Sequence, residues 1–142
     1  MGGRGGVLAA GPARTNARLY TDENPLSPIP FADKVKLLED VNAYARARDP
    51  RVRQVSVSVS GEWSAIEIMR PGGAVVRDFR PLVRFNVSVT AGEGDRQESG
   101  TFGAGGREHY QRYISPEAWS AGVDEALRQA IVNLSSEPAP AG

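Results

Sequence analysis

His109 is the only histidine of the chain and the first side chain to consider as a catalytic base. It lies between Glu108 and Tyr110, and no serine or cysteine nucleophile has a recognisable setting nearby. Zinc sites in proteins use three or four protein ligands, mostly histidine and cysteine. This chain has one histidine and no cysteine. We therefore interpret His109 as a solvated loop residue and predict no catalytic residue and no metal ligand in this chain.

A glycine-rich stretch over residues 99–107 invites comparison with phosphate-binding loops. It lacks the Gly-Lys-Ser/Thr ending of a P-loop, and no predicted helix starts at it, as a dinucleotide-binding fingerprint requires. We interpret it as a flexible or closely packed loop that follows a polar edge strand over residues 96–102.

A strand at the edge of a sheet offers a second reading of the same stretch. Its unpaired backbone groups can bind an extended peptide as an additional strand, and glycines let that peptide come close. The candidate residues of this peptide-binding edge are Ser99, Thr101, Gly103, Gly105 and Arg107. An equal alternative is that other domains cover the edge.

Charged residues gather around Pro81, namely Arg77, Asp78, Arg80 and Arg84. The guanidinium of arginine binds carboxylates through two parallel hydrogen bonds. Arg80 and Arg84 are therefore candidates for a protein interface or for contact with a substrate carboxylate. The alternative, held about even, is a solvated sheet face with ordinary ion pairs, each worth little.

Composition narrows the class of protein. The 142 residues suffice for one domain, and 17 basic residues balance 17 acidic ones. Nucleic-acid binding needs a clustered basic excess, and a membrane helix needs about 20 consecutive apolar residues. The sequence has neither feature, so we expect no nucleic acid and no membrane among its partners.

Hydrophobic periodicity predicts the elements that position these residues. Glycines and prolines make residues 1–30 a flexible linker. Helical spacing over residues 31–48 predicts a helix whose apolar stripe contains Phe31, Val35, Leu38, Val41 and Ala45 and is widened by Leu37 and Tyr44. Alternation of apolar and polar residues then predicts about five antiparallel strands, over residues 52–60, 63–69, 74–79, 82–90 and 96–102.

A second long helix has clear start and stop signals. Ser115 is a natural N-cap, Pro116 fits the first helical position, and Ser135 ends the apolar stripe. That stripe consists of Trp119, Val123, Ala126, Ala130 and Leu134. The predicted fold is α+β: a helix, an antiparallel sheet of about five strands and a helix, after a flexible N-terminal segment.

Several segments in sequence order carry a resemblance. They are Thr15-Asn16-Ala17-Arg18-Leu19-Tyr20, Asn24-Pro25-Leu26, Lys34-Val35-Lys36-Leu37-Leu38, Asp49-Pro50-Arg51-Val52, Arg80-Pro81-Leu82-Val83-Arg84-Phe85-Asn86-Val87, Glu98-Ser99-Gly100, Gly103-Ala104-Gly105-Gly106-Arg107, Asp124-Glu125-Ala126-Leu127-Arg128-Gln129-Ala130 and Asn133-Leu134. Together they resemble the central region of the TldD/PmbA metallopeptidase family, and within that family they resemble the TldD-like subunit. The resemblance implies a linker over residues 1–30, a central domain over 31–138 and a linker to an absent catalytic region over 139–142.

The resemblance also implies a function for the complete protein. TldD-like subunits hold zinc on an HExxxH motif, pair with a TldE/PmbA-like subunit, and degrade or mature peptides in the cytoplasm. This sequence contains no HExxxH motif, so we expect a fragment that needs no cofactor, is inactive alone, and contributes to subunit contacts and the substrate channel. The alternative is an independent binding or regulatory module without peptidase activity.

Overall fold

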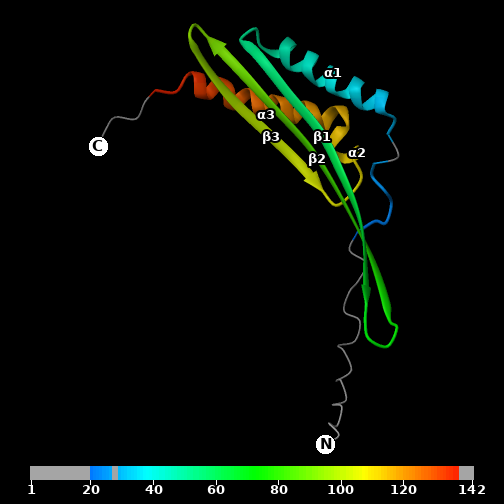
Figure 1. Ribbon diagram of the computed structural model, residues 1–142. Coiled ribbons are helices and arrows are strands. Elements are labelled where there is room, and N and C mark those ends of the chain that lie inside the picture. The colour runs from blue at the N-terminus through cyan, green and yellow to red at the C-terminus, as the bar shows by residue number, and fades with distance from the viewer. Residues whose placement is uncertain (1–19, 27–28, 138–142) are drawn as a thin grey trace, which may run out of the picture.

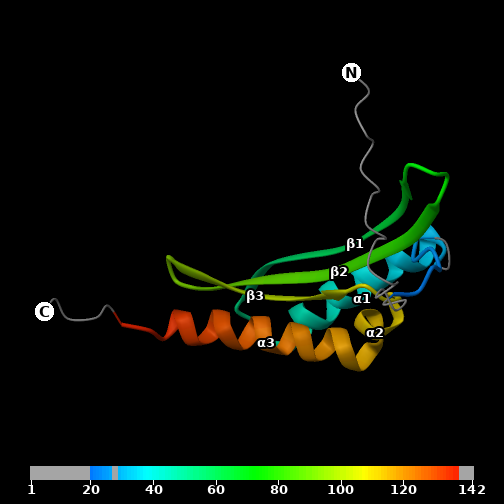
Figure 2. The same cartoon turned by 90° about the horizontal axis from the view of Figure 1, so that it is seen from below.

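The computed structural model describes residues 20–26 and 29–137, which form an α+β fold (Figure 1). The elements are α1 (Phe31–Arg48), β1 (Val52–Met69), β2 (Val75–Glu93), β3 (Arg96–Gly106), α2 (Gln111–Ile114) and α3 (Pro116–Leu134). The strands are antiparallel and lie in the order β1-β2-β3. Figure 2 shows the helices on one face of the sheet and the other face open. Most residues of the two predicted linkers, 1–30 and 139–142, lie outside the described residues.

The sheet has three long strands, so the prediction of about five strands is wrong. The predicted strands omit residues 61–62 and 80–81, yet Gly61 pairs with Val83 and Pro81 pairs with Trp63. β3 ends opposite Val83, so β2 has an open edge where Pro81 lies and tolerates a residue without an N–H. Gly61 leaves the space that the hydroxyl of Tyr110 occupies.

A tight turn joins β1 to β2 after residue 70. Gly72 and Gly73 have φ angles of 97° and 87°, which side chains disfavour, and the N–H of Arg70 donates to the carbonyl of Ala74 at 2.9 Å. The β1–β2 hairpin therefore continues beyond the end of β3 and projects from the body of the molecule (Figure 1).

The core lies between β2 and the two long helices. The inward side chains of β2 are Val83, Phe85, Val87 and Val89, all at most 2% exposed. Phe85, Val87 and Val89 pack in one cluster with Val41 and Ala45 of α1 and with Val123, Ala126 and Leu127 of α3. The start of α3 is confirmed, since Ser115 Oγ accepts a hydrogen bond from the N–H of Ala118 at 3.3 Å.

The predicted stripe of α1 is wrong at its N-terminal end. Phe31 is 81% exposed and Val35 is 37% exposed, whereas Val41 and Ala45 are fully buried. Leu37 and Tyr44, which widen the predicted stripe, pack on the core. The helix is therefore rotated about its axis so that Leu37, and not Val35, faces inward. Leu37 lines a pocket together with Val59 and Trp119.

Candidate peptide-binding edge and open sheet face

β3 is an edge strand and carries most of the predicted peptide-binding residues. Ser99, Thr101, Gly103 and Gly105 occupy alternate positions of β3 and therefore share one face of the sheet. Their partners on β2 are Thr90, Ser88, Asn86 and Arg84. This is the open face, because Gly100 and Phe102 on the opposite face contact α3. The loop predicted over residues 103–106 is wrong, since these residues form the end of β3 and Arg107 follows it.

Side chains of α3 cover the first half of this edge. Gln129 Oε1 accepts a hydrogen bond from the N–H of Thr101 at 3.2 Å, and Asn133 Nδ2 donates to the carbonyl of Ser99 at 3.3 Å. In an antiparallel strand the N–H and C=O of alternate residues point to the same side. The backbone groups of Gly103 and Gly105 therefore point outward as well.

The second half of the edge is open. Within residues 20–26 and 29–137, no hydrogen-bond partner is found on the outer side of Gly103 or Gly105. The cover on the first half comes from α3 of this domain, and cover by other domains stays an alternative prediction. α3 covers Ser99 and Thr101, and Gly103 and Gly105 keep unpaired donors and acceptors, which is the requirement for adding a strand.

Two glycines bring α3 close enough to reach the edge. A Cβ on Gly100 would collide with the carbonyl oxygen of Ala126 and lie 2.7 Å from the backbone N of Ala130. A Cβ on Gly122 would lie 2.5 Å from the ring of Phe102. The backbones of β3 and α3 therefore touch at Gly100, and this contact holds Gln129 beside Thr101.

Glu125 orients Gln129. Gln129 Nε2 donates to Glu125 Oε1 at 2.9 Å, and the guanidinium of Arg128 donates to both carboxylate oxygens of Glu125 at 2.7 and 2.8 Å. The hydrogen bonds from Arg128, followed by that from Gln129, lower the pKa of Glu125 from its ordinary 4.5 to about 2. The ionised carboxylate thus fixes which end of the Gln129 amide faces the strand.

We expect acid to weaken the packing of α3 through Glu125. The pKa of Glu125 is lower in the folded chain than in the unfolded chain, so its stabilising contribution is complete above pH 4.5 and is lost as the pH falls towards 2. The urea midpoint of the Glu125→Gln variant should therefore fall less than that of the wild type between pH 4.5 and 2. Glu137→Gln, at the exposed end after α3, is the control and should follow the wild type; identical pH curves for all three proteins would contradict this role of Glu125.

The two candidate arginines lie on the open face but differ in their surroundings. Arg80 Nε donates to Asp78 at 2.9 Å, beyond the end of β3. Arg84 is exposed and forms no ion pair with any carboxylate of the described residues. The structure therefore places Arg84 on the central strand, opposite Gly105 of the open edge, and leaves Arg80 on the projecting hairpin.

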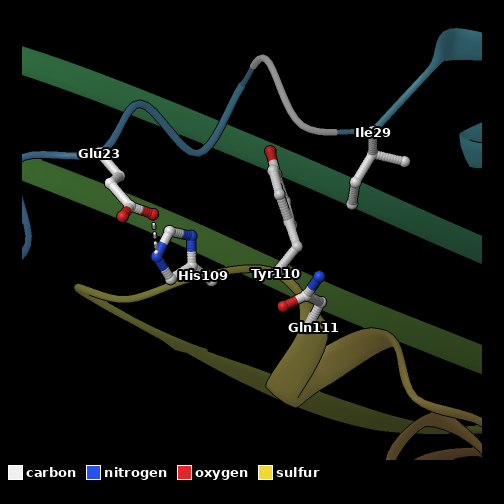
Figure 3. A pocket seen from close by; sticks show the side chains of 5 residues that line it. All are labelled: Glu23, Ile29, His109, Tyr110 and Gln111. Atoms are coloured by element: carbon white, nitrogen blue, oxygen red, sulfur yellow. Dashed lines mark ion pairs between the residues drawn. The ribbon is translucent and has the colours of Figure 1, made fainter.

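His109 lies in a small pocket beside the end of β3. Figure 3 shows its imidazole pointing at Glu23, and Nε2 lies 2.9 Å from Glu23 Oε2. Ile29, Tyr110 and Gln111 line the same pocket. No group of three or more His, Cys, Asp and Glu that could hold a metal ion occurs among the described residues. The pocket therefore does not fit the zinc that the family implies, and no hydrolytic step is derived from it.

Comparison with known proteins gives the family. Residues 24–134 match the model of the PmbA/TldA metallopeptidase central domain. The chain belongs to this family. The match confirms the resemblance seen in the sequence, and it covers the sheet and both long helices of the PmbA/TldA central domain described above.

Two curated relatives resemble this chain over most of its length. The chain is 39% identical to the metalloprotease TldD homolog of Haemophilus influenzae over 127 residues, covering 87% of this chain and 26% of the relative. It is 37% identical to the TldD homolog of Buchnera aphidicola subsp. Schizaphis graminum over 132 residues, covering 87% and 27%. The chain thus spans about a quarter of the length of these relatives.

The structural match shows the fold of the central domain. The structure is that of a Thermotoga maritima protein named for a proposed role as modulator of a DNA gyrase, and the TM-score is 0.64 at 18% identity. The superposition covers 89% of this chain and 29% of that protein. Among the described residues, no helix has the length and apolar character needed to span a membrane.

The sequence did not reveal every residue that shapes the edge. Glu125, Gln129 and Asn133 lie at four-residue spacing on α3, and this polar stripe borders the predicted apolar one. That spacing is the signal from which the sequence could have indicated these three residues. That β3 lies beside them follows only from the folded structure. Glu23 was missed because its contact with His109 joins distant parts of the sequence.

Proposed function

We propose that this chain is the non-catalytic central domain of a TldD-like zinc metallopeptidase that degrades and matures peptides in the cytoplasm. The observation that carries the proposal is the match of residues 24–134 to the central domain of this peptidase family. Zinc is bound, in this proposal, by residues outside this chain, because the described residues do not fit a zinc site.

Within the complete protein, we propose that the β3 edge holds extended peptide in the substrate channel. Gly103 and Gly105 have outward backbone groups without partners in the described part of the chain. Backbone pairing of this kind recognises peptides with little regard to their side chains, which suits a peptidase with varied substrates. Gln129 and Asn133 would release Thr101 and Ser99 to a longer peptide.

We further propose that the open face at Arg80 and the projecting hairpin contact the TldE/PmbA-like partner subunit. The end of the hairpin exposes large apolar side chains: Ile68 is 53%, Met69 73% and Val75 48% exposed. Apolar side chains gathered at one exposed end are typical of protein–protein contacts.

Peptide binding at the edge can be tested on this chain by nuclear magnetic resonance. Titration with an extended eight-residue peptide should shift the amide signals of Gly103 and Gly105 most strongly. Gly103→Pro removes one outward N–H at an edge position that tolerates proline, and losing one hydrogen bond of about 1 kcal/mol should weaken binding about fivefold.

Gly103→Ala is the matched control, since its Cβ would approach only the side chain of Asn86 and the N–H remains. Unchanged amide signals at millimolar peptide, or equal binding by the proline and alanine variants, would refute the edge as a binding site.

The peptidase assignment has an independent test in the gene. Extending the genomic reading frame downstream should reveal an HExxxH motif in frame or behind a single frameshift. An authentic stop with no such motif in reach would favour an independent binding module instead.

A further inference from the structure

Side chains of β2 lie across the two open glycines of β3. A Cβ on Gly105 would lie 3.0 Å from Cγ of Arg84, and a Cβ on Gly103 would lie 2.9 Å from Oδ1 of Asn86. The stem of Arg84 therefore occupies the space above Gly105 and leads from β2 towards the free edge. A side chain at position 105 would occupy the space through which the stem of Arg84 extends.

The guanidinium of Arg84 also forms no ion pair with a described residue. Its neighbours on the same strand, Arg77 and Arg80, pair with Glu67 and Asp78. Arg84 has no carboxylate partner among the described residues. Arg107, the candidate that directly follows the end of β3, adds a second positive charge and has its guanidinium 5.3 Å from the ring centre of Tyr20.

The distances suit a side chain on an added strand. Neighbouring strands lie about 4.8 Å apart, so a peptide paired with β3 would run about 9.6 Å from β2. An extended arginine covers most of that span, and a glutamate or aspartate pointing back along the open face covers the rest. Long side chains interact over such cross-strand distances, and arginine pairs well with carboxylates.

We propose that the β3 edge prefers an extended peptide with an acidic side chain opposite Gly105, and that Arg84 pairs with this carboxylate across the glycine. The inference rests on the proposed function, since it needs a peptide on the edge. It assigns Arg84 as a specificity residue for acidic peptides, with Arg107 adding favourable charge.

The test compares three eight-residue peptides of one sequence that carry glutamate, glutamine or lysine at a single central position. Fluorescence anisotropy with the 142-residue chain should give about threefold tighter binding of the glutamate peptide than of the glutamine peptide, as expected for an exposed ion pair. The lysine peptide should bind most weakly. The preference should shrink at 1 M salt, where exposed charges are screened.

Arg84→Gln should abolish the preference for glutamate, so that the glutamate and glutamine peptides bind with equal affinity. The matched control is Arg53→Gln, which removes the same charge from an exposed position at the far end of β1; it should keep the preference. Equal binding of the glutamate and glutamine peptides, or a preference that survives in Arg84→Gln, would overturn the inference while the edge itself stands.

Failure of the proposed function looks different. In that case no peptide binds, or Gly103→Pro leaves the affinity for the glutamine peptide unchanged, and the inference about Arg84 falls with it.

Discussion

Replacing Gly100 with alanine is expected to lower the free energy of unfolding by about 3 kcal/mol, the upper end of the usual cost of overpacking. The added Cβ would collide with the backbone carbonyl of Ala126. A backbone group in a regular helix cannot rotate away as a side chain can, so α3 as a whole has to move off β3. Chemical unfolding in urea, followed by circular dichroism, measures the loss.

The same substitution should open the covered half of the edge. When α3 moves, Gln129 leaves the N–H of Thr101, and hydrogen exchange at that amide should accelerate. Gly103→Ala is the control on the same strand, because its Cβ would meet only the mobile end of Asn86; its stability should change by less than about 1 kcal/mol. Equal losses in the two variants would show that the contact between β3 and α3 is not tight at Gly100.

Phe85→Ala is expected to cost about 4 kcal/mol, because the variant loses a large buried ring and leaves a cavity between the sheet and both helices. Phe85 is 1% exposed and belongs to the central cluster with Val41 and Val123. Since a domain of this size has only about 5–15 kcal/mol of stability, the variant should unfold at a much lower urea concentration.

Phe31→Ala is the matched control, with the same change in side chain at a position that is 81% exposed. Surface substitutions usually change stability by less than about 0.5 kcal/mol. A large loss for Phe31→Ala would contradict the orientation of α1 and restore the apolar stripe that its spacing predicts.

The two long helices show where sequence patterns succeed and where they fail. The apolar stripe of α3 is buried as predicted, from Val123 to Leu134, because one continuous sheet face lies beside it. In α1 the predicted stripe was wide, with Phe31 and Val35 towards one side of it and Leu37 and Tyr44 towards the other. Spacing alone does not choose between them, since both satisfy the helical period.

The strands show a similar limit. Alternating residues predicted the apolar face that β2 buries, but the predicted strands omitted Gly61 and Pro81. Both residues lie inside long strands. The glycine makes room for Tyr110, and the proline lies where β2 has no neighbour on one side. Such exceptions depend on partners that are distant in the sequence.

For the candidate site, the sequence by itself determined the family, the bounds of both long helices, the polar edge strand and the residue types along it. Local signals suffice for these features. Helix caps, the period of apolar residues and the family segments each depend on residues that are close together in the sequence. Only the tertiary structure decided which half of the edge is free, since α3 had to pack on Gly100 before Gln129 could reach Thr101. The tertiary structure likewise placed Arg84 over Gly105, because strand register, which the spacing of local motifs does not specify, sets which side chains of β2 face which residues of β3.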